Sequence, residues 1–185
     1  MWRWLLLLLL WLSGCASPPV VQAPIAAQAT FVLTGRIAVQ HGERRQTAGL
    51  RWTHRLQSDT VDLLTPLGGT AARIYRDSEH ATLQREQQVQ EADNLEALMQ
   101  QVLGWYLPLA GLNHWVLARP MPGRPVEMTR NASGQLDTLL QDGWRIRYSR
   151  YSDTQPQTLP TRMQLEYEDL RVTLLLDEWE WNSVE

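Results

Sequence analysis

Apolar and polar residues alternate with a period of two through most of the chain, which is typical of half-buried strands. The first such segment places Phe31, Leu33, Ile37 and Val39 on one face. Gly35 lies in the same register, which predicts a β-bulge or the close approach of a neighbouring backbone. Further strands are expected over residues 46–53, 60–64, 70–75, 81–85, 126–130, 136–140, 144–148, 163–167 and 171–176. Short strands at intervals of about ten residues favour an antiparallel barrel or sandwich.

In the middle of the chain the period changes to that of a helix. Asp93 stands in an N-cap position, and Glu96, three residues later, completes a capping-box pattern. The apolar residues that follow at helical spacing are Leu95, Leu98, Met99, Val102 and Leu103. Gly104 ends this helix, and Pro108 begins a second one over residues 109–118. The sequence therefore predicts an α+β domain, a curled antiparallel sheet with a helical insertion; helices over a curved sheet leave an apolar cavity where side chains do not fill the space.

The N-terminal segment has a different pattern. Arg3 precedes a run of leucines and tryptophans that ends in Ser13, Gly14 and Cys15. An apolar run of about ten residues is too short for a bilayer-spanning helix, which needs roughly 20, and it fits the core of a signal peptide. The small residues before the cysteine resemble a bacterial lipobox, which implies cleavage before Cys15, a diacylglycerol on its sulfur and an acyl group on the new N-terminus. We expect a signal peptide at 1–14, a lipidated flexible tether at 15–29 and a folded domain at 30–185.

The alternative for this segment is an ordinary secreted protein with an incidental cysteine, and an exposed lone thiol disfavours it in an oxidising compartment. No later apolar run reaches membrane-spanning length. We therefore expect a protein that lipids anchor to a membrane. Ala16 follows the cysteine; in Gram-negative lipoproteins aspartate at this position favours the inner membrane, so its absence favours the outer membrane, with the domain in the periplasm.

Composition and motifs exclude several classes of protein. Without the signal peptide the chain has 16 basic and 20 acidic residues, a net charge of −4, and no basic patch for nucleic acid. One cysteine allows neither a disulfide framework nor a cysteine metal site. Four histidines occur without metal-ligand spacing: His41, His54, His80 and His114. The first three are expected on the surface, in turns or at strand ends. Glu166 and Glu168 are interpreted as solvated carboxylates on the outer face of a strand.

The sequence also contains no G-x-S-x-G, no G-x-G-x-x-G and no Walker loop. We therefore expect no enzyme, no metal site and no cofactor besides the lipids on Cys15.

A leucine lies at the tip of a predicted turn between two strands, in the segment 63–70 (LLTPLGGT). Pro66 fixes φ at its position and the glycines at 68 and 69 permit positive φ, so the turn is tight and protrudes. Leu67 cannot easily fold back into the core. It is either a plug against a neighbouring loop or an exposed apolar finger for a membrane or lipid. Inserting one leucine is worth roughly 1.5–3 kcal/mol, which suits a reversible contact and not an anchor.

The chain resembles the LolB family of outer-membrane lipoprotein receptors. The resemblance covers residues 31–180 and rests on LTGRIAV (33–39), LRW (50–52), LTPLGGT (64–70), LGWYLPL (103–109), WV (115–116), DGW (142–144) and DEW (177–179). Thr65 stands where the family commonly has asparagine. Either side chain can hydrogen-bond within its own turn.

The resemblance implies an incomplete antiparallel β-barrel of about eleven strands, with helices over the open side and an apolar cavity between. It implies a monomeric receptor that accepts cargo lipoproteins from the periplasmic carrier LolA and inserts them, without ATP, into the inner leaflet of the outer membrane. In that family the leucine of the Pro-Leu-Gly loop, here Pro66, Leu67 and Gly68, is needed for insertion.

Candidates for the wall of the acyl-chain cavity are large apolar residues on inward faces, and each of them could equally be ordinary core. They are Trp52, Leu103, Trp105, Leu107, Trp115, Trp144, Ile146, Tyr148, Leu174 and Leu176. Arg36 and Arg51 alternate with apolar residues and are expected to face outward. The alternative function is a structural lipoprotein that binds an outer-membrane protein complex through its sheet; an apolar dye or a fatty acid should bind the domain only under the first hypothesis.

Overall fold

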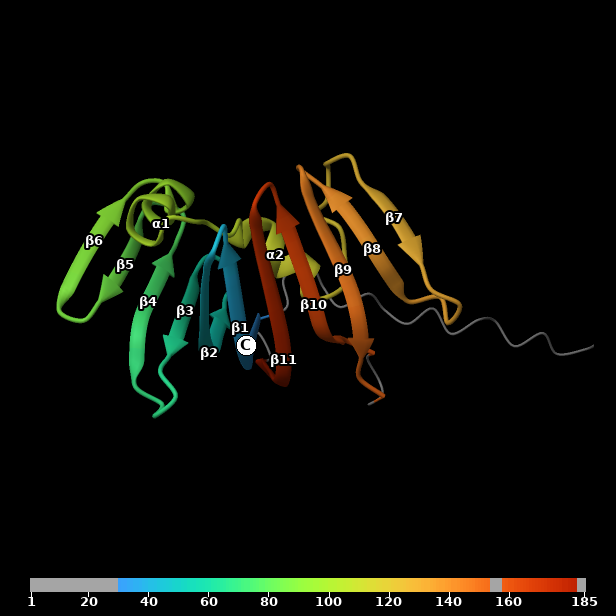
Figure 1. The fold of residues 1–185 in the computed structure, drawn as a ribbon, viewed down its shortest axis with the longest axis horizontal. Coiled ribbons are helices and arrows are strands. Elements are labelled where there is room, and N and C mark those ends of the chain that lie inside the picture. The colour runs from blue at the N-terminus through green and yellow to red at the C-terminus, as the bar shows by residue number, and fades with distance from the viewer. Residues whose placement is uncertain (1–29, 154–157, 183–185) are drawn as a thin grey trace, which may run out of the picture.

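The chain folds into one open antiparallel sheet, curved across its width, with two short helices (Figure 1). The computed structural model describes residues 30–153 and 158–182, so the expected signal peptide and tether lie outside the described residues. The order of the eleven strands is β6-β5-β4-β3-β2-β1-β11-β10-β9-β8-β7. The expected fold class, an incomplete barrel with a helical insertion, is confirmed.

The elements have these bounds: β1 Thr30–His41, β2 Arg44–His54, β3 Asp59–Leu64, β4 Thr70–Arg76, β5 Ala81–Arg85, β6 Gln88–Ala92, α1 Leu95–Leu103, α2 Leu109–Trp115, β7 Glu127–Arg130, β8 Leu136–Gln141, β9 Trp144–Tyr151, β10 Pro160–Tyr167 and β11 Leu170–Asn182.

The helices cover the sheet because of the chain's topology. β1 to β6 form one meander, β7 to β11 form another, and the two meanders join in the middle of the sheet through the pairing of β1 with β11. The connection from β6 to β7 therefore runs from one edge of the sheet to the other. It carries both helices across the inner face (Figure 1). No helix in the described part of the chain has the length and apolarity to cross a bilayer.

The core lies between the inner face of the sheet and this helical segment. Inward-facing residues of the strands, such as Leu33, Met163 and Leu165, are fully buried. Buried residues of the helices pack against the same cluster, among them Met99 and Trp115. Arg36 and Arg51 are exposed, as expected from their alternation with core residues.

The two helices differ from prediction at their ends. α1 is capped by Asn94, whose side chain accepts from the backbone N–H of Ala97 at 2.9 Å. The predicted cap at Asp93 is wrong by one residue, because asparagine and aspartate are equally good caps in adjacent positions. The predicted capping box with Glu96 is wrong as well, since the third residue after Asn94 is Ala97. Gly104 ends the helix in a left-handed conformation, as expected. The second helix ends at Trp115 and not at 118.

Two strand predictions also need correction. β6 was not predicted: four of its five residues are exposed and its one branched aliphatic side chain, Val89, faces solvent, so no alternation marks it. β11 continues to Asn182, beyond the expected end at 176. Its extension pairs with the start of β1, where Trp179 and Trp181 stack at 5.4 Å between ring centroids.

Gly35 lies at a bulge and at a close backbone approach, as its position in the alternation predicts, and the extra residue of the bulge is Asp177 on the partner strand β11. The register between β1 and β11 shifts between Thr34 and Gly35. A Cβ atom at Gly35 would lie 2.1 Å from the carbonyl oxygen of Leu175. The two central strands can approach this closely only because position 35 has no side chain.

We expect Gly35→Ala to destabilise the protein by about 1–3 kcal/mol or more, since the clash is with backbone and cannot be relieved by a rotamer change. Urea denaturation measures the free energy of unfolding. Gly69→Ala is the control, because its Cβ would meet only Thr65 Oγ1 at 3.4 Å. Equal stabilities of the two variants would show that the strands tolerate a side chain at the bulge.

Candidate functional site

The loop between β3 and β4, residues 65–69, is a compact turn that its own hydrogen bonds hold. The backbone N–H of Thr65 donates to the carbonyl of Gly69 at 2.7 Å, and that of Gly68 donates to the carbonyl of Thr65 at 2.9 Å. The Thr65 hydroxyl accepts from the N–H of Gly69 at 3.1 Å. Gly68 uses the positive φ that the sequence predicted, at +83°, whereas Gly69 does not. Threonine thus makes the local hydrogen bond expected at this position.

Leu67 projects from this loop into solvent, and 98% of its surface is exposed. Other exposed apolar residues are about half covered by the protein: Leu56 is 51% and Val89 55% exposed. A rigid turn therefore presents one bare leucine, and no charged residue lies within residues 65–69. The hypothesis of a plug against a neighbouring loop is wrong for this conformation. We call residues 65–69 the leucine loop.

The ten residues predicted for the acyl-chain cavity lie between the inner face of the sheet and the helical segment, all within or packed against the core cluster. Nine of them are buried, with exposures of 6% or less, and Leu103 is half-buried. Side chains thus fill most of this interior. Whether these residues contact acyl chains stays a prediction.

Leu103 and Trp105 differ from the others, because they line an inner cavity of about 190 Å³ between the helical segment and β1 to β5. Its walls include Ile37 and Ala72, and Arg85 stands among its polar lining. Within the described residues the indole Nε1 of Trp105 is buried and has no hydrogen-bond partner. An unpaired buried donor costs about 1–3 kcal/mol, so a polar group of a bound ligand would be favoured there.

α2 is fastened to the sheet by polar contacts at the other side of the interior. The indole of Trp115 donates to Gln141 Oε1 at 3.0 Å, and the hydroxyl of Tyr148 donates to the carbonyl of Trp115 at 2.9 Å. Gln141 also exchanges two hydrogen bonds with the backbone of Met121, at 2.8 and 2.9 Å. α1 packs instead on the edge strand β6 and its neighbour β5.

One histidine prediction is wrong. His54 is buried, and its Nδ1 lies 2.7 Å from Oδ1 of Asp59, which also accepts from the indole of Trp52 at 2.8 Å. Arg76 forms an ion pair with the other oxygen of Asp59. Burial alone would raise the pKa of Asp59, but the hydrogen bond from His54 and the charge of Arg76 outweigh burial and lower it. The four residues tie the ends of β2, β3 and β4 together beneath the aromatic ring of Phe31.

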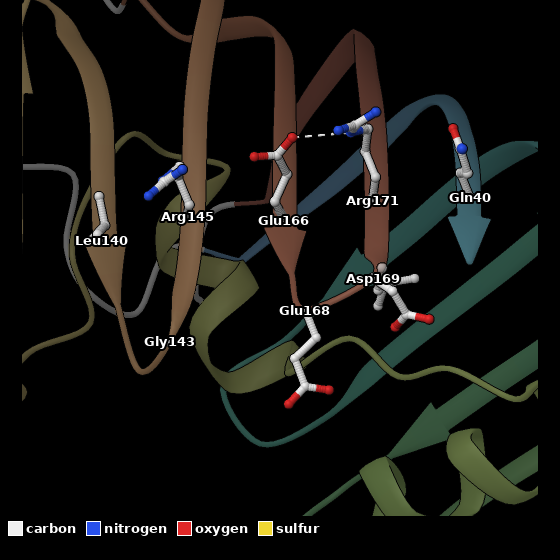
Figure 2. A pocket seen from close by; sticks show the side chains of 9 residues that line it. Gln40, Leu140, Gly143, Arg145, Glu166, Glu168, Asp169 and Arg171 are labelled. Carbon is white, nitrogen blue, oxygen red and sulfur yellow. Dashed lines mark hydrogen bonds and ion pairs between the residues drawn. The ribbon is translucent and has the colours of Figure 1, made fainter. Parts of the chain in front are cut away.

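A polar groove of about 420 Å³ lies on the outer face of β9, β10 and β11 (Figure 2). Its wall includes Glu166, which accepts from Arg171 at 3.0 Å and from Arg147 at 3.2 Å. Glu166 is thus an ion-pair partner rather than a free carboxylate, whereas Glu168 lies in the following turn. Charged walls of both signs do not suit an acyl chain.

The described residues hold no group of three or more histidine, cysteine, aspartate or glutamate side chains that could bind a metal ion. Cys15, the predicted lipidation site, lies outside the described residues. The part of the site that the structure describes is therefore the leucine loop together with the apolar interior.

Comparisons with known proteins place the chain among lipoproteins of the outer membrane. Residues 29–179 match the family model of outer membrane lipoprotein LolB. The outer-membrane lipoprotein LolB of Nitrosomonas europaea is 37% identical over 193 residues, which cover 96% of this chain and 91% of the relative. That of Azoarcus sp. strain BH72 is 36% identical over 173 residues, 91% of this chain and 89% of the relative.

Among solved structures, a LolA superfamily protein from Nitrosomonas europaea has a TM-score of 0.54, with 86% of this chain and 89% of that chain covered. A DUF1329 family protein from Desulfovibrio piger has the same TM-score, with 85% and 88% covered. Their identities to this chain are 10% and 6%, so the likeness concerns the fold alone.

Proposed function

The chain belongs to the LolB family of outer-membrane lipoproteins, and on this premise we propose that it takes up lipidated proteins in its apolar interior and inserts them into the outer membrane through the leucine loop. It is an outer-membrane protein of lipoprotein localisation and not an enzyme. The observation that carries the insertion step is Leu67, 98% exposed at the tip of a hydrogen-bonded turn. We further propose that Cys15 carries the lipid anchor.

The physical need for such a receptor follows from the cargo. Each acyl CH₂ gains about 0.8 kcal/mol on leaving water, so a protein with three acyl chains does not cross the periplasm unaided. A soluble carrier, in this proposal LolA, must deliver the chains to an acceptor in which they are bound more favourably. Because transfer uses no ATP, each successive site binds the chains more tightly than the one before.

Uptake requires the interior to widen. Ligand pockets in proteins usually measure about 300–1,000 Å³, and the inner cavity of about 190 Å³ lies below that range. The wall that moves is the one that Leu103 and Trp105 form, since α2 is held by Trp115, Gln141 and Tyr148. The unpaired indole N–H of Trp105 would then donate to a carbonyl of the incoming lipid.

Delivery is the second step. A single leucine inserted into a bilayer contributes roughly 1.5–3 kcal/mol, so the contact forms and breaks readily. The lipid anchor keeps the receptor at the membrane throughout. The leucine loop therefore places the apolar interior near the bilayer without a permanent attachment of its own.

The first experiment mixes the untethered domain, residues 30–185, with the carrier loaded with one lipidated cargo, and follows the cargo by pull-down. We expect the cargo to move to the domain. If it stays on the carrier while circular dichroism shows a folded domain, the receptor function fails and a protein partner in the outer membrane becomes the better hypothesis. A second, independent measurement is the binding of a fatty acid to the domain alone. We expect such binding for a lipoprotein receptor and none for a structural lipoprotein that binds a protein partner.

A further inference from the structure

A third hollow, of about 330 Å³, lies on the outer face of the sheet beside the leucine loop. We call it the outer hollow. Its floor consists of β11, β1 and β2, where Ala38 lies opposite Thr47 on one side and Thr173 on the other. Residues that alternate with these, such as Leu174, are buried in the core. The outer hollow and the inner cavity are therefore on opposite faces of the sheet.

Small side chains create the outer hollow. Positions 38 and 49 carry alanine and glycine, and a Cβ atom at Gly49 would lie only 3.1 Å from Leu64 Cβ. Larger apolar side chains stand around this depression: Leu64, Leu175 and Pro66. The result is an apolar recess, open to solvent, in the middle of the sheet.

The apolar lining is an exception on this face. Outward positions of β9 and β10 are charged or polar, among them Arg145 and Arg147 on β9 and Glu166 on β10. Exposed apolar surface with a polar rim is typical of sites that contact a ligand, a membrane or another protein. The position of the outer hollow also points to a membrane contact. Pro66 lines it, and the next residue is Leu67 at the tip of the leucine loop.

One cationic side chain, Arg36, lines the outer hollow, and a second, Arg51, lies farther along the same face of the sheet. Arg36 lines the outer hollow and pairs with Asp177 at 3.3 Å, and 65% of its side chain remains exposed. Arg51 lies on the same face of β2, two residues from Gly49. It is exposed and has no ion-pair partner within residues 30–153 and 158–182. The nearby Asp62 is held by Arg73 in a bidentate pair. An apolar recess with a guanidinium group at its edge matches an acyl chain joined to a phosphate.

We propose that the outer hollow binds one acyl chain of a membrane phospholipid, with the lipid phosphate at Arg36, when Leu67 enters the bilayer. The inference rests on the proposed function, since it needs the leucine loop at the membrane. Entry of Leu67 brings Pro66 and the open side of the outer hollow to the lipid surface. The bound lipid then fixes the orientation of the sheet relative to the bilayer, which a single inserted side chain does not do.

Photolabelling tests this proposal with the full chain, purified with its own N-terminal segment and reconstituted in vesicles of phosphatidylethanolamine and phosphatidylglycerol. The vesicles contain a trace of phospholipid with a diazirine at the end of one acyl chain, and mass spectrometry locates the labelled residues after irradiation. We expect label on β1, β2 and β11 around Ala38 and Leu175. Cargo delivery is measured in the same vesicles.

The variant Ala38→Phe fills the outer hollow and should reduce this label at least tenfold. Ser149→Phe adds the same ring on the outer face of β9 and should leave the label unchanged. Thr173→Phe places the same ring in the outer hollow from β11 and replaces Ala38→Phe if that variant does not fold.

Label confined to the leucine loop, or found in the inner cavity, would overturn the outer hollow as a lipid site even if cargo is delivered. Label in the outer hollow without cargo delivery would support the lipid site and contradict the proposed function. Label that appears only in an unlipidated Cys15→Ser protein would show that the chain's own lipid occupies the outer hollow, which also overturns the proposal.

Discussion

Leu67→Glu should leave the uptake of cargo intact and reduce its release into vesicles by about ten- to hundredfold. The leucine contributes roughly 1.5–3 kcal/mol when it enters an apolar phase, and 1.4 kcal/mol corresponds to a factor of ten. A carboxylate adds a further cost, because an ionised group is expelled from hydrocarbon. Uptake is measured by pull-down from the loaded carrier, and release by flotation of the cargo with vesicles.

The fold should not respond to this change. Leu67 is 98% exposed and the hydrogen bonds of its turn are between backbone atoms and Thr65, so the stability should stay within about 0.5 kcal/mol. Leu56→Glu is the matched control: it makes the same substitution at a half-exposed leucine in the turn at the other end of β3. Equal release from the two variants, or normal release from Leu67→Glu, would refute the insertion step.

The leucine loop was predictable because its signal is local. Pro66 and Gly68 determine the backbone of the turn, and a leucine between them has no neighbouring core to enter. The outer hollow was not predictable in this way. It forms where Ala38, Gly49 and Leu175 from three strands meet, and only the register of those strands brings them together.

Most of the sheet followed from the alternation of apolar residues, because one face of each central strand is buried. β6 escaped prediction for the opposite reason: it is an edge strand with almost no buried side chain. The volume of the interior could not be predicted either. The sequence identifies inward-facing residues such as Trp105 and Ile146, but how closely they pack depends on the placement of the helical segment.

His54 illustrates a different limit. A polar residue at a strand end is usually on the surface, and Asp59, the hydrogen-bond partner of the buried His54, lies beyond the next turn. A carboxylate can accept but not donate, so the close nitrogen of His54 carries the proton when Asp59 is ionised. A buried polar group of this kind depends on its partners, which no periodic pattern reveals.

Asp59→Ala should destabilise the fold by about 3–5 kcal/mol, a large part of the stability of a domain of this size. Asp59 is 1% exposed and accepts from Trp52, His54 and Arg76. Its removal leaves two buried donors and a guanidinium without their acceptor. The control is Asp62→Ala on the same strand, which breaks the outer-face pair with Arg73 and should cost about 1 kcal/mol or less. Urea denaturation at pH 7 measures the free energy of unfolding of both variants. Equal decreases would show that the buried contacts of Asp59 stabilise the fold no more than the exposed pair of Asp62 does.

The effect should also depend on pH, and Asp59→Asn tests this with little change in shape. His54 and Arg76 hold the pKa of Asp59 below its usual 3.8 despite burial, so the carboxylate binds its proton less readily in the folded than in the unfolded chain. Its contribution is therefore fully present above about pH 4 and is lost as the pH falls through the folded-state pKa. The difference in unfolding free energy between the wild type and Asp59→Asn should shrink from pH 7 to pH 3. A difference that stays constant over this range would mean that the charge of Asp59 does not stabilise the junction of β2, β3 and β4.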